Sequence, residues 1–154
     1  MENAKLTVER ARAADGPWIA RAQVLMARES EGLELDPEVV GQGVRRVFDE
    51  PERGFYLVAR RSGSDEPLGC ALIQPEWSDW RNAEVWWIHS LYVVEPDRRQ
   101  GVFRRMFEHV RAEARMAGVR GLRLIVERKN ARARAVYARL GMTSEHYETF
   151  EILF

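Results

Sequence analysis

Cysteine is scarce in this chain of 154 residues, because Cys70 is the only one. A single thiol excludes an intramolecular disulfide. A zinc site would have to be built on His89, His109 and His146, and their positions follow no metal-ligand spacing. Hydrophobic residues make up 45% of the chain, which is typical of a globular protein. We therefore expect a fold that is stabilised by an apolar core and holds no metal.

Long hydrophobic runs are also absent. No apolar segment approaches the roughly 18 residues that a membrane-spanning helix needs. Met1–Gly16 is charged throughout and lacks the apolar stretch of a secretion signal. We expect a cytoplasmic protein with no membrane partner. A length of 154 residues predicts a single domain over residues 1–154, since domains commonly have about 100–200 residues.

The net charge is zero, but the charges are unevenly distributed. From Arg98 to Arg139 there are thirteen Arg and Lys residues and three acids. Such a basic segment indicates an anionic partner, which would be either nucleic acid or a phosphorylated cofactor. The alternative interpretation is that these arginines lie on solvated helix faces.

The hydrophobic periodicity predicts a mixed α/β fold in the order β-α-α-β-β-β-α-β-α-β. Asp15 and Asp36 are expected to cap the first two helices, the second of which is weakened by Gly41 and Gly43. Helices should cover both faces of a mixed sheet. The expected strands are Lys5–Arg12, Phe55–Arg60, Leu68–Gln74, Glu84–Val94, Leu122–Val126 and His146–Phe154, and the later helices are Arg98–Gly118 and Ala131–Leu140.

One motif lies where the long strand Glu84–Val94 is followed by a turn rich in arginine and a helix that Gly101 opens. The first backbone N–H groups of a helix lack partners within it, and the helix dipole favours an anion there. Glycine allows close approach to the backbone, while Arg98, Arg99 and Arg104 add positive charge. This pattern favours phosphate binding.

A second motif runs from Asn130 to Gly141-Met142. Asn130 occupies the N-cap position of the predicted helix. Tyr137 follows seven residues later, so both side chains project from one side of the helix about 10 Å apart. Tyr137 could equally be a core residue of an amphipathic helix.

Together, the two motifs resemble those of the GCN5-related N-acetyltransferase (GNAT) superfamily. Arg98-Arg99-Gln100-Gly101-Val102-Phe103 resembles the cofactor signature of that family, although Phe103 stands where the family has a small residue. The segment from Asn130 through Ala133 and Tyr137 to Gly141-Met142 resembles its later motif. The resemblance implies a mostly antiparallel, twisted sheet flanked by helices, and acetyl-CoA as cosubstrate without a metal.

The resemblance also implies cofactor-binding residues. The long strand would splay from Leu122–Val126, and its backbone at Leu91, Tyr92 and Val93 would pair with the pantetheine arm. Asn130 would contact the same arm. The pyrophosphate would rest on the turn and helix start that comprise Arg98, Arg99, Gln100, Gly101, Val102, Phe103 and Arg104.

The reaction implied by the resemblance is direct attack of an amine on the thioester. A backbone N–H near Leu91–Tyr92 would polarise the carbonyl group. Tyr137 would donate a proton to the leaving thiolate. His89 is a candidate general base, with Glu84 and Glu127 as others, and the alternative for His89 is a strand histidine satisfied by a hydrogen bond.

The acceptor would be a small-molecule or peptide amine, and the protein a monomer or homodimer. The first two helices and the loop before the long strand would form the acceptor pocket. These regions carry acids and tryptophans that suit a cationic amine or lie in solvent: Glu29, Glu31, Glu34, Asp36, Glu38, Asp79, Trp77 and Trp80.

Two other functions remain open from the sequence. One is an acyl-CoA sensor of the same fold that performs no catalysis. The other is a nucleic-acid-binding protein that uses Arg98–Arg139. The second is disfavoured, because few aromatic residues interleave the basic segment and no nucleic-acid signature accompanies it, so we expect no nucleic-acid partner.

Overall fold

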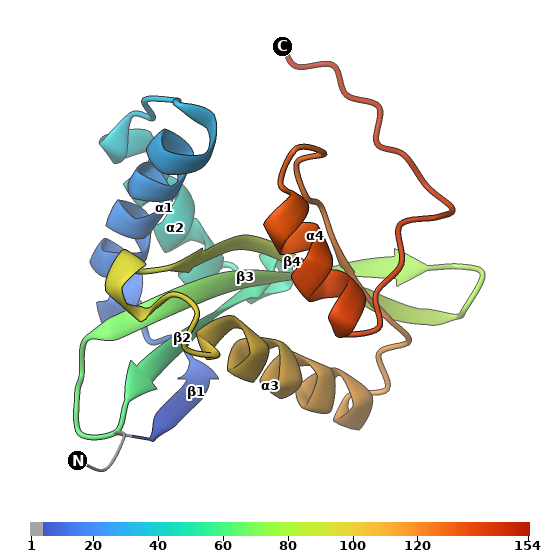
Figure 1. The fold of residues 1–154 in the computed structure, drawn as a ribbon, viewed down its shortest axis with the longest axis horizontal. Helices are drawn as coiled ribbons and strands as arrows, with labels where there is room; N and C mark the ends of the chain where they lie inside the picture. The colour runs from blue at the N-terminus through green and yellow to red at the C-terminus, as the bar shows by residue number, and fades with distance from the viewer. Residues whose placement is uncertain (1–4) are drawn as a thin grey trace. The chain divides into compact units, whose positions relative to one another are not determined.

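The computed structural model describes residues 5–154, which divide between Leu124 and Ile125 into two compact units that are treated separately. No helix within residues 5–154 is long and apolar enough to cross a membrane. The first unit contains β1 (Leu6–Arg10), α1 (Gly16–Glu31), α2 (Pro37–Asp49), β2 (Phe55–Arg61), β3 (Pro67–Ser78), β4 (Ala83–Val93), α3 (Val102–Met116) and β5 (Leu122–Leu124) (Figure 1).

The five strands form one sheet in the order β1-β2-β3-β4-β5. The first three pairings are antiparallel, and β5 pairs parallel with β4. Helices α1 and α2 lie on one side of this sheet and α3 on the other (Figure 1). The predicted mixed, mostly antiparallel sheet with helices on both faces is therefore confirmed.

Each face of the sheet has an apolar core of its own. Under α1 and α2, Ile19 and Val44 pack with Tyr56, Val58 and Tyr92. On the opposite face α3 approaches β3 so closely that a Cβ at Gly69 would lie 3.2 Å from the Cγ1 atom of Val102 and 3.4 Å from the Sδ atom of Met106. The side chains of this layer are held at close-packed distances, as in other protein interiors.

Of the two predicted N-terminal helix caps, Asp36 is confirmed and Asp15 is not. Asp36 caps α2 as predicted, because its carboxylate accepts a hydrogen bond from the Glu38 N–H at 2.9 Å. Helix α2 continues through both Gly41 and Gly43. Asp15 occupies the N-cap position of α1, but the predicted cap is wrong, since its side chain makes no capping bond. It pairs instead with a buried arginine.

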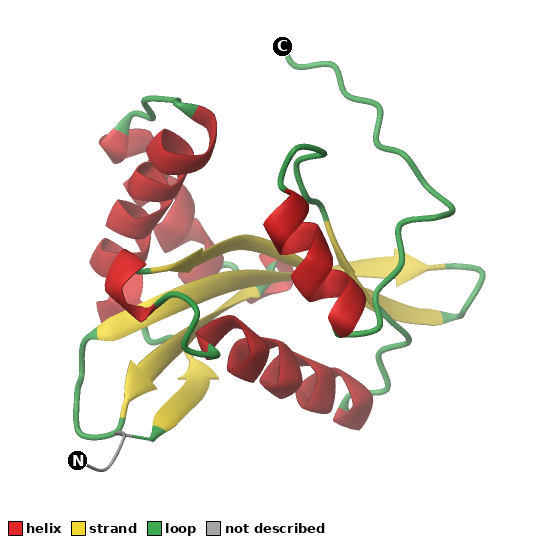
Figure 2. Cartoon of the chain, in the orientation of Figure 1, coloured by secondary structure: helices red, strands yellow, loops and turns green. Residues whose placement is uncertain are grey.

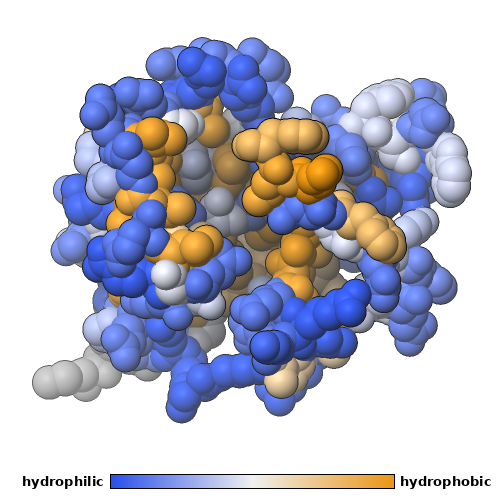
Figure 3. Space-filling view, turned by 90° about the horizontal axis from the view of Figure 1, so that it is seen from above, coloured by the Kyte–Doolittle hydropathy of each residue, from blue (hydrophilic) through white to orange (hydrophobic). Residues whose placement is uncertain are grey.

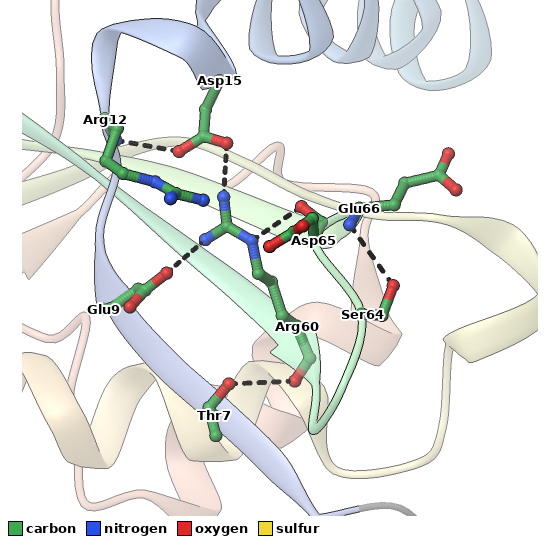
Figure 4. A network of polar contacts seen from close by, with 8 residues as sticks. All are labelled: Thr7, Glu9, Arg12, Asp15, Arg60, Ser64, Asp65 and Glu66. Carbon is green, nitrogen blue, oxygen red and sulfur yellow. Dashed lines mark hydrogen bonds and ion pairs between the residues drawn. The ribbon is translucent and has the colours of Figure 1, made fainter.

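That arginine is Arg60 of β2, and it organises one end of the sheet (Figure 4). Its guanidinium forms an ion pair with Asp15 and another with Glu9 at 2.6 Å. Its Nε donates to the Asp65 carbonyl at 2.8 Å in the turn between β2 and β3. Asp15 also accepts from the Arg12 N–H at 2.8 Å. The Arg60 and Asp15 side chains are only 5% and 7% exposed. Their ion pair is therefore the main interaction that offsets the free energy each charge loses when it leaves water.

The second unit contains α4 (Ala131–Arg139), and Asn130 caps it as predicted, with its Oδ1 atom accepting from the Ala133 N–H at 3.0 Å. The predicted closing strand His146–Phe154 is wrong, because these residues have no strand structure (Figure 2). Phe150 is 92% exposed. Alternation of apolar residues favours a strand only when a neighbour supplies the hydrogen bonds, and no strand pairing reaches this segment in the described part of the chain.

The buried ion pair generates a prediction about stability. The substitution Arg60→Met should lower the free energy of unfolding by about 3–5 kcal/mol, because it leaves the Asp15 carboxylate buried without its cation. Urea denaturation measures the effect. Arg46→Met is the matched control: the Arg46 side chain is 66% exposed, and its pair with Glu50 at 3.7 Å is worth less than about 1 kcal/mol. Equal losses in the two variants would contradict a structural role for the buried pair.

Candidate functional site

Strand β4 is interrupted by a bulge at its centre. Leu72 of β3 pairs with His89, and Cys70 pairs with Tyr92, so two residues of β4, Ser90 and Leu91, face the single residue between Cys70 and Leu72. Ser90 has a φ of +52°, a left-handed conformation that is uncommon for a residue other than glycine. A bulge of this kind bends the strand and redirects its backbone groups, and such strain is concentrated at functional sites.

The bulge is held from α1 by a buried amide. Gln23 is 8% exposed, and its Nε2 atom donates to the Ser90 carbonyl at 3.1 Å. The same atom lies 3.5 Å from the sulfur of Cys70. Burial raises the pKa of the Cys70 thiol to about 12. Because a buried amide is costly without a partner, this contact fixes α1 and the bulge relative to each other.

Strands β4 and β5 pair over a short length only. Trp86, Trp87 and Ile88 pair with Leu122, Arg123 and Leu124, where β5 ends, whereas β4 continues to Val93. Within the sheet that the structure describes, the backbone of Leu91–Val93 therefore has a strand partner only on the β3 side. The pairing of β4 with β5 therefore ends at Ile88, two residues before Ser90 of the bulge.

The turn that follows β4, Val94–Gly101, is held by side chains at several points. Arg98 donates from Nε to the Val93 carbonyl at 2.8 Å and from its terminal nitrogen to Glu29 at 2.5 Å. Gln100 donates to the Pro96 carbonyl at 2.9 Å. Arg99 and Gly101 both have a positive φ, +64° and +78°. The backbone of this turn is thus held in an irregular shape before α3 begins.

The Arg98 side chain is held by residues of β4 and α1. Its guanidinium lies 5.4 Å from the centre of the Tyr92 ring, and its hydrogen bond is the main cause that lowers the pKa of Glu29. The Tyr92 hydroxyl donates to Glu29 at 3.1 Å. Arg98 therefore connects the turn to α1. Arg104, on the exposed side of α3, pairs with Glu108 at 3.0 Å.

The start of α3 offers backbone donors. The Arg105 N–H donates to the Gly101 carbonyl at 3.0 Å, and helix geometry provides no acceptor within the helix for the amides of Val102 and Arg104. A Cβ placed at Gly101 would meet nothing within 4 Å, so the space beside this amide is open. Phe103, which replaces a small residue of the motif, directs its ring toward Phe107 at 6.1 Å. The helix start can thus receive an anion.

A cavity of about 430 Å³ lies beside α1, α2 and the sheet. It reaches the bulge, since Ser90 is one of its lining residues. Tyr56 of β2 also lines it, and burial raises the pKa of this phenol to about 12. The sequence interpretation missed Gln23 and Tyr56 as lining residues. Gln23 lies between Ile19 and Ala27 at helical spacing, so a glutamine in an apolar series was a usable signal for the first. Nothing in the sequence distinguished Tyr56 from a core aromatic residue.

His89 occupies the α1–α2 face of the sheet, directly opposite Leu72. Its ring stacks on that of Trp87 with centroids 5.5 Å apart and planes inclined by 3°. Burial lowers its pKa, so the imidazole stays neutral further into the acidic range. His89 lies next to Ser90 in the strand but does not line the cavity.

The acids expected around an acceptor pocket have separate roles. Glu31 lines the cavity. Glu34 pairs with Arg28 at 2.8 Å, and Glu29 with Arg98. Trp77 and Trp80 are 63% and 85% exposed and belong to the end of the β3–β4 hairpin. The face of the molecule drawn in Figure 3 is mostly hydrophilic, with apolar patches between the hydrophilic residues.

In the second unit, Tyr137 lies on α4 two turns after Asn130, as the motif spacing predicts. It is half-buried, and burial raises the pKa of its phenol. The phenol is therefore protonated at neutral pH. Within residues 5–154 no three His, Cys, Asp or Glu side chains are grouped so that they could hold a metal ion.

Comparison with known proteins assigns the family. The sequence model of the acetyltransferase (GNAT) family matches residues 22–142, and the chain belongs to that family. It is 25% identical over 130 residues to the D-amino-acid N-acetyltransferase HPA3 of Saccharomyces cerevisiae, which covers 82% of this chain and 78% of that protein.

Solved structures agree with this assignment. The crystal structure of a possible acetyltransferase from Clostridium difficile 630 is 33% identical, covers 97% of both chains and has a TM-score of 0.88. A ribosomal-protein-alanine N-acetyltransferase from Brucella melitensis biovar Abortus 2308 shares the fold at 13% identity, with a TM-score of 0.78 over 97% of this chain and 99% of that one.

The contact between Gln23 and the bulge can be tested through stability. Gln23→Met keeps the length of the side chain but removes the donor to the Ser90 carbonyl, so the free energy of unfolding should fall by about 1–3 kcal/mol. Gln42→Met, at an exposed position of α2, should change it by less than about 0.5 kcal/mol. Denaturant titration of both variants provides the comparison, and a Gln23 variant as stable as the control would show that the amide does not hold the bulge.

Proposed function

We propose that this chain is an acetyl-CoA-dependent N-acetyltransferase that transfers an acetyl group to a primary amine by direct attack on the thioester. One observation carries the proposal: a single strand, β4, leads from a bulge that borders a cavity into a turn and helix start suited to an anion. A two-substrate transfer needs such an arrangement, because the donor and the acceptor must meet at one point.

The residues of the first unit fit coenzyme A. The open space at Gly101 and the amides that start α3 suit a pyrophosphate, and Arg99 and Arg104 add positive charge nearby. The backbone of Leu91, Tyr92 and Val93, which has no β5 partner, can pair with the amides of a pantetheine arm. Asn130, beyond its cap, is proposed as a further contact for that arm.

When bound, acetyl-CoA supplies an activated acetyl group as a thioester. The backbone N–H groups at Leu91–Tyr92, redirected by the bulge, would polarise the acetyl carbonyl. His89, neutral because of its lowered pKa, is the proposed acceptor of the proton that the amine loses. The phenol of Tyr137 would donate a proton to the thiolate that leaves.

An amine acceptor is also supported by relatives. The similar protein from Saccharomyces cerevisiae is named as an N-acetyltransferase of D-amino acids, and the one from Brucella melitensis as an N-acetyltransferase of a ribosomal protein. Both names describe transfer to nitrogen, which supports a nitrogen acceptor for this chain.

Binding of coenzyme A tests the donor site without knowledge of the acceptor. Gly101→Val should weaken binding of CoA at least about tenfold in calorimetry, because a branched side chain would occupy the space that the phosphate needs. Gly118→Val, at the other end of α3, is the matched control. Gly118 has nearly the same φ, +75°, and similar open space, so both variants carry similar backbone strain.

The rival functions give different results in the same titration. A nucleic-acid-binding protein would bind an oligonucleotide with steep salt dependence and would release no heat with CoA. That outcome would overturn the proposed function. Equal loss of CoA binding in the Gly101 and Gly118 variants would remove the turn from the donor site.

The role of Tyr137 is tested by Tyr137→Phe, which keeps the ring and removes the proton. If the phenol is the acid, kcat should fall about 10²–10⁴-fold while CoA affinity stays the same. Release of free thiol measures kcat, and a pre-steady-state burst experiment shows whether product release limits the rate. An unchanged chemical step would leave Tyr137 as a packing residue.

A further inference from the structure

The cavity beside the bulge has a polar end and an apolar wall. Its polar lining groups at the sheet are Gln23, Tyr56 and Ser90, next to the point where the acetyl group is expected. Away from the sheet, α1, α2 and the segment between them line it mostly with apolar side chains, namely Met26, Ala27, Leu35, Val40 and Val44, and Ser30 and Glu31 are the polar residues there. A volume of about 430 Å³ lies within the range of small-molecule sites.

Among the described lining residues of the cavity, one carries a charge. Glu31 is an acid that lines it, and no Lys or Arg is among the lining residues in the described part of the chain. Tyr56 remains a neutral phenol, since burial raises its pKa. A ligand carboxylate placed here would lose hydration without gaining a cation from the lining residues.

Gly43 adds to the volume of the cavity because it lines the cavity without a side chain. It lies inside α2, where glycine is among the least favourable residues, and it lines the cavity. A Cβ built at Gly43 would meet nothing within 4 Å. Any larger residue would project into open space at the α2 side of the site, so the absence of a side chain keeps that space available.

From these features we propose, building on the N-acetyltransferase function above, that the acceptor is a primary amine that carries a compact apolar group and no carboxylate beside the nitrogen. The amine lies at the bulge, and its apolar group lies against Met26, Leu35, Val40 and Val44. Gly43 is the residue that sets how large this group can be. The acceptor class thus differs from the amino acids named for the Saccharomyces cerevisiae relative.

The predicted preference for acceptors without a carboxylate is tested with a matched pair of amines. Leucine and 3-methylbutylamine share the same branched apolar group and differ by the carboxylate alone. With acetyl-CoA as donor, kcat/KM for 3-methylbutylamine should exceed that for either enantiomer of leucine at least about 100-fold. Equal or better use of leucine would overturn the proposal.

The size limit is tested with Gly43→Met. This variant should raise KM for 3-methylbutylamine at least about tenfold, with a smaller effect on ethylamine, because methionine fills the space for the apolar group. Gly41→Met is the control: it is the same change on the same helix, and a Cβ there would contact only the Arg45 side chain, at 3.7 Å. Equal KM values in the two variants would remove Gly43 from the site.

The failure of this inference can be separated from the failure of the proposed function. Calorimetric titration of CoA and acetylation of a broader amine panel, including spermidine and peptides, are measured on the same protein. Acetylation of spermidine, a peptide or leucine in preference to 3-methylbutylamine overturns the acceptor class and leaves an N-acetyltransferase. The absence of both CoA binding and transfer to any amine overturns both.

Discussion

The hydrogen bond from the Gln23 amide to the Ser90 carbonyl is the contact on which the arrangement of the candidate site depends. It joins the helix that walls the cavity to the one residue of β4 that adopts a left-handed conformation. Without a bulge, the pleat of β4 would continue regularly past His89, and the side chains beyond it would face the opposite sides of the sheet. The bulge lets Tyr92 face α1, where its hydroxyl reaches Glu29.

A second tie between α1 and β4 lies further along the same helix. Glu29 binds both Tyr92 and Arg98, about 9 Å along the helix axis from Gln23. One rigid helix therefore contacts both the bulge and the turn that leads into α3.

The sequence predicted the order of the elements well, because that order depends on periodicity and turn residues that are local. Asp36, Gly118 and Asn130 marked helix ends that the structure contains. Asp15 failed as a cap because a partner distant in sequence, Arg60, competes for its carboxylate. The segment His146–Phe154 failed as a strand because its pattern says nothing about whether a neighbouring edge is supplied.

The candidate site was predictable where it rests on a motif and unpredictable where it rests on tertiary contacts. The helix start after Gly101 followed from sequence, since it is a local feature. That Arg98 would bind Glu29 could not be predicted, because the two residues are 69 positions apart. The bulge at Ser90 could not be predicted from sequence either, since it depends on the register between β3 and β4 and on the Gln23 amide of α1.

The state of the lone thiol has a consequence for a protein that handles a thioester. Cys70 is fully buried, and a pKa of about 12 leaves almost none of it as thiolate at neutral pH. Thiolate is the form in which cysteine attacks thioesters and disulfides, so Cys70 of the folded chain does not take an acyl group from a thioester. The same burial shields the sulfur from disulfide reagents, so that a colorimetric thiol reagent would register released coenzyme A against a silent protein background.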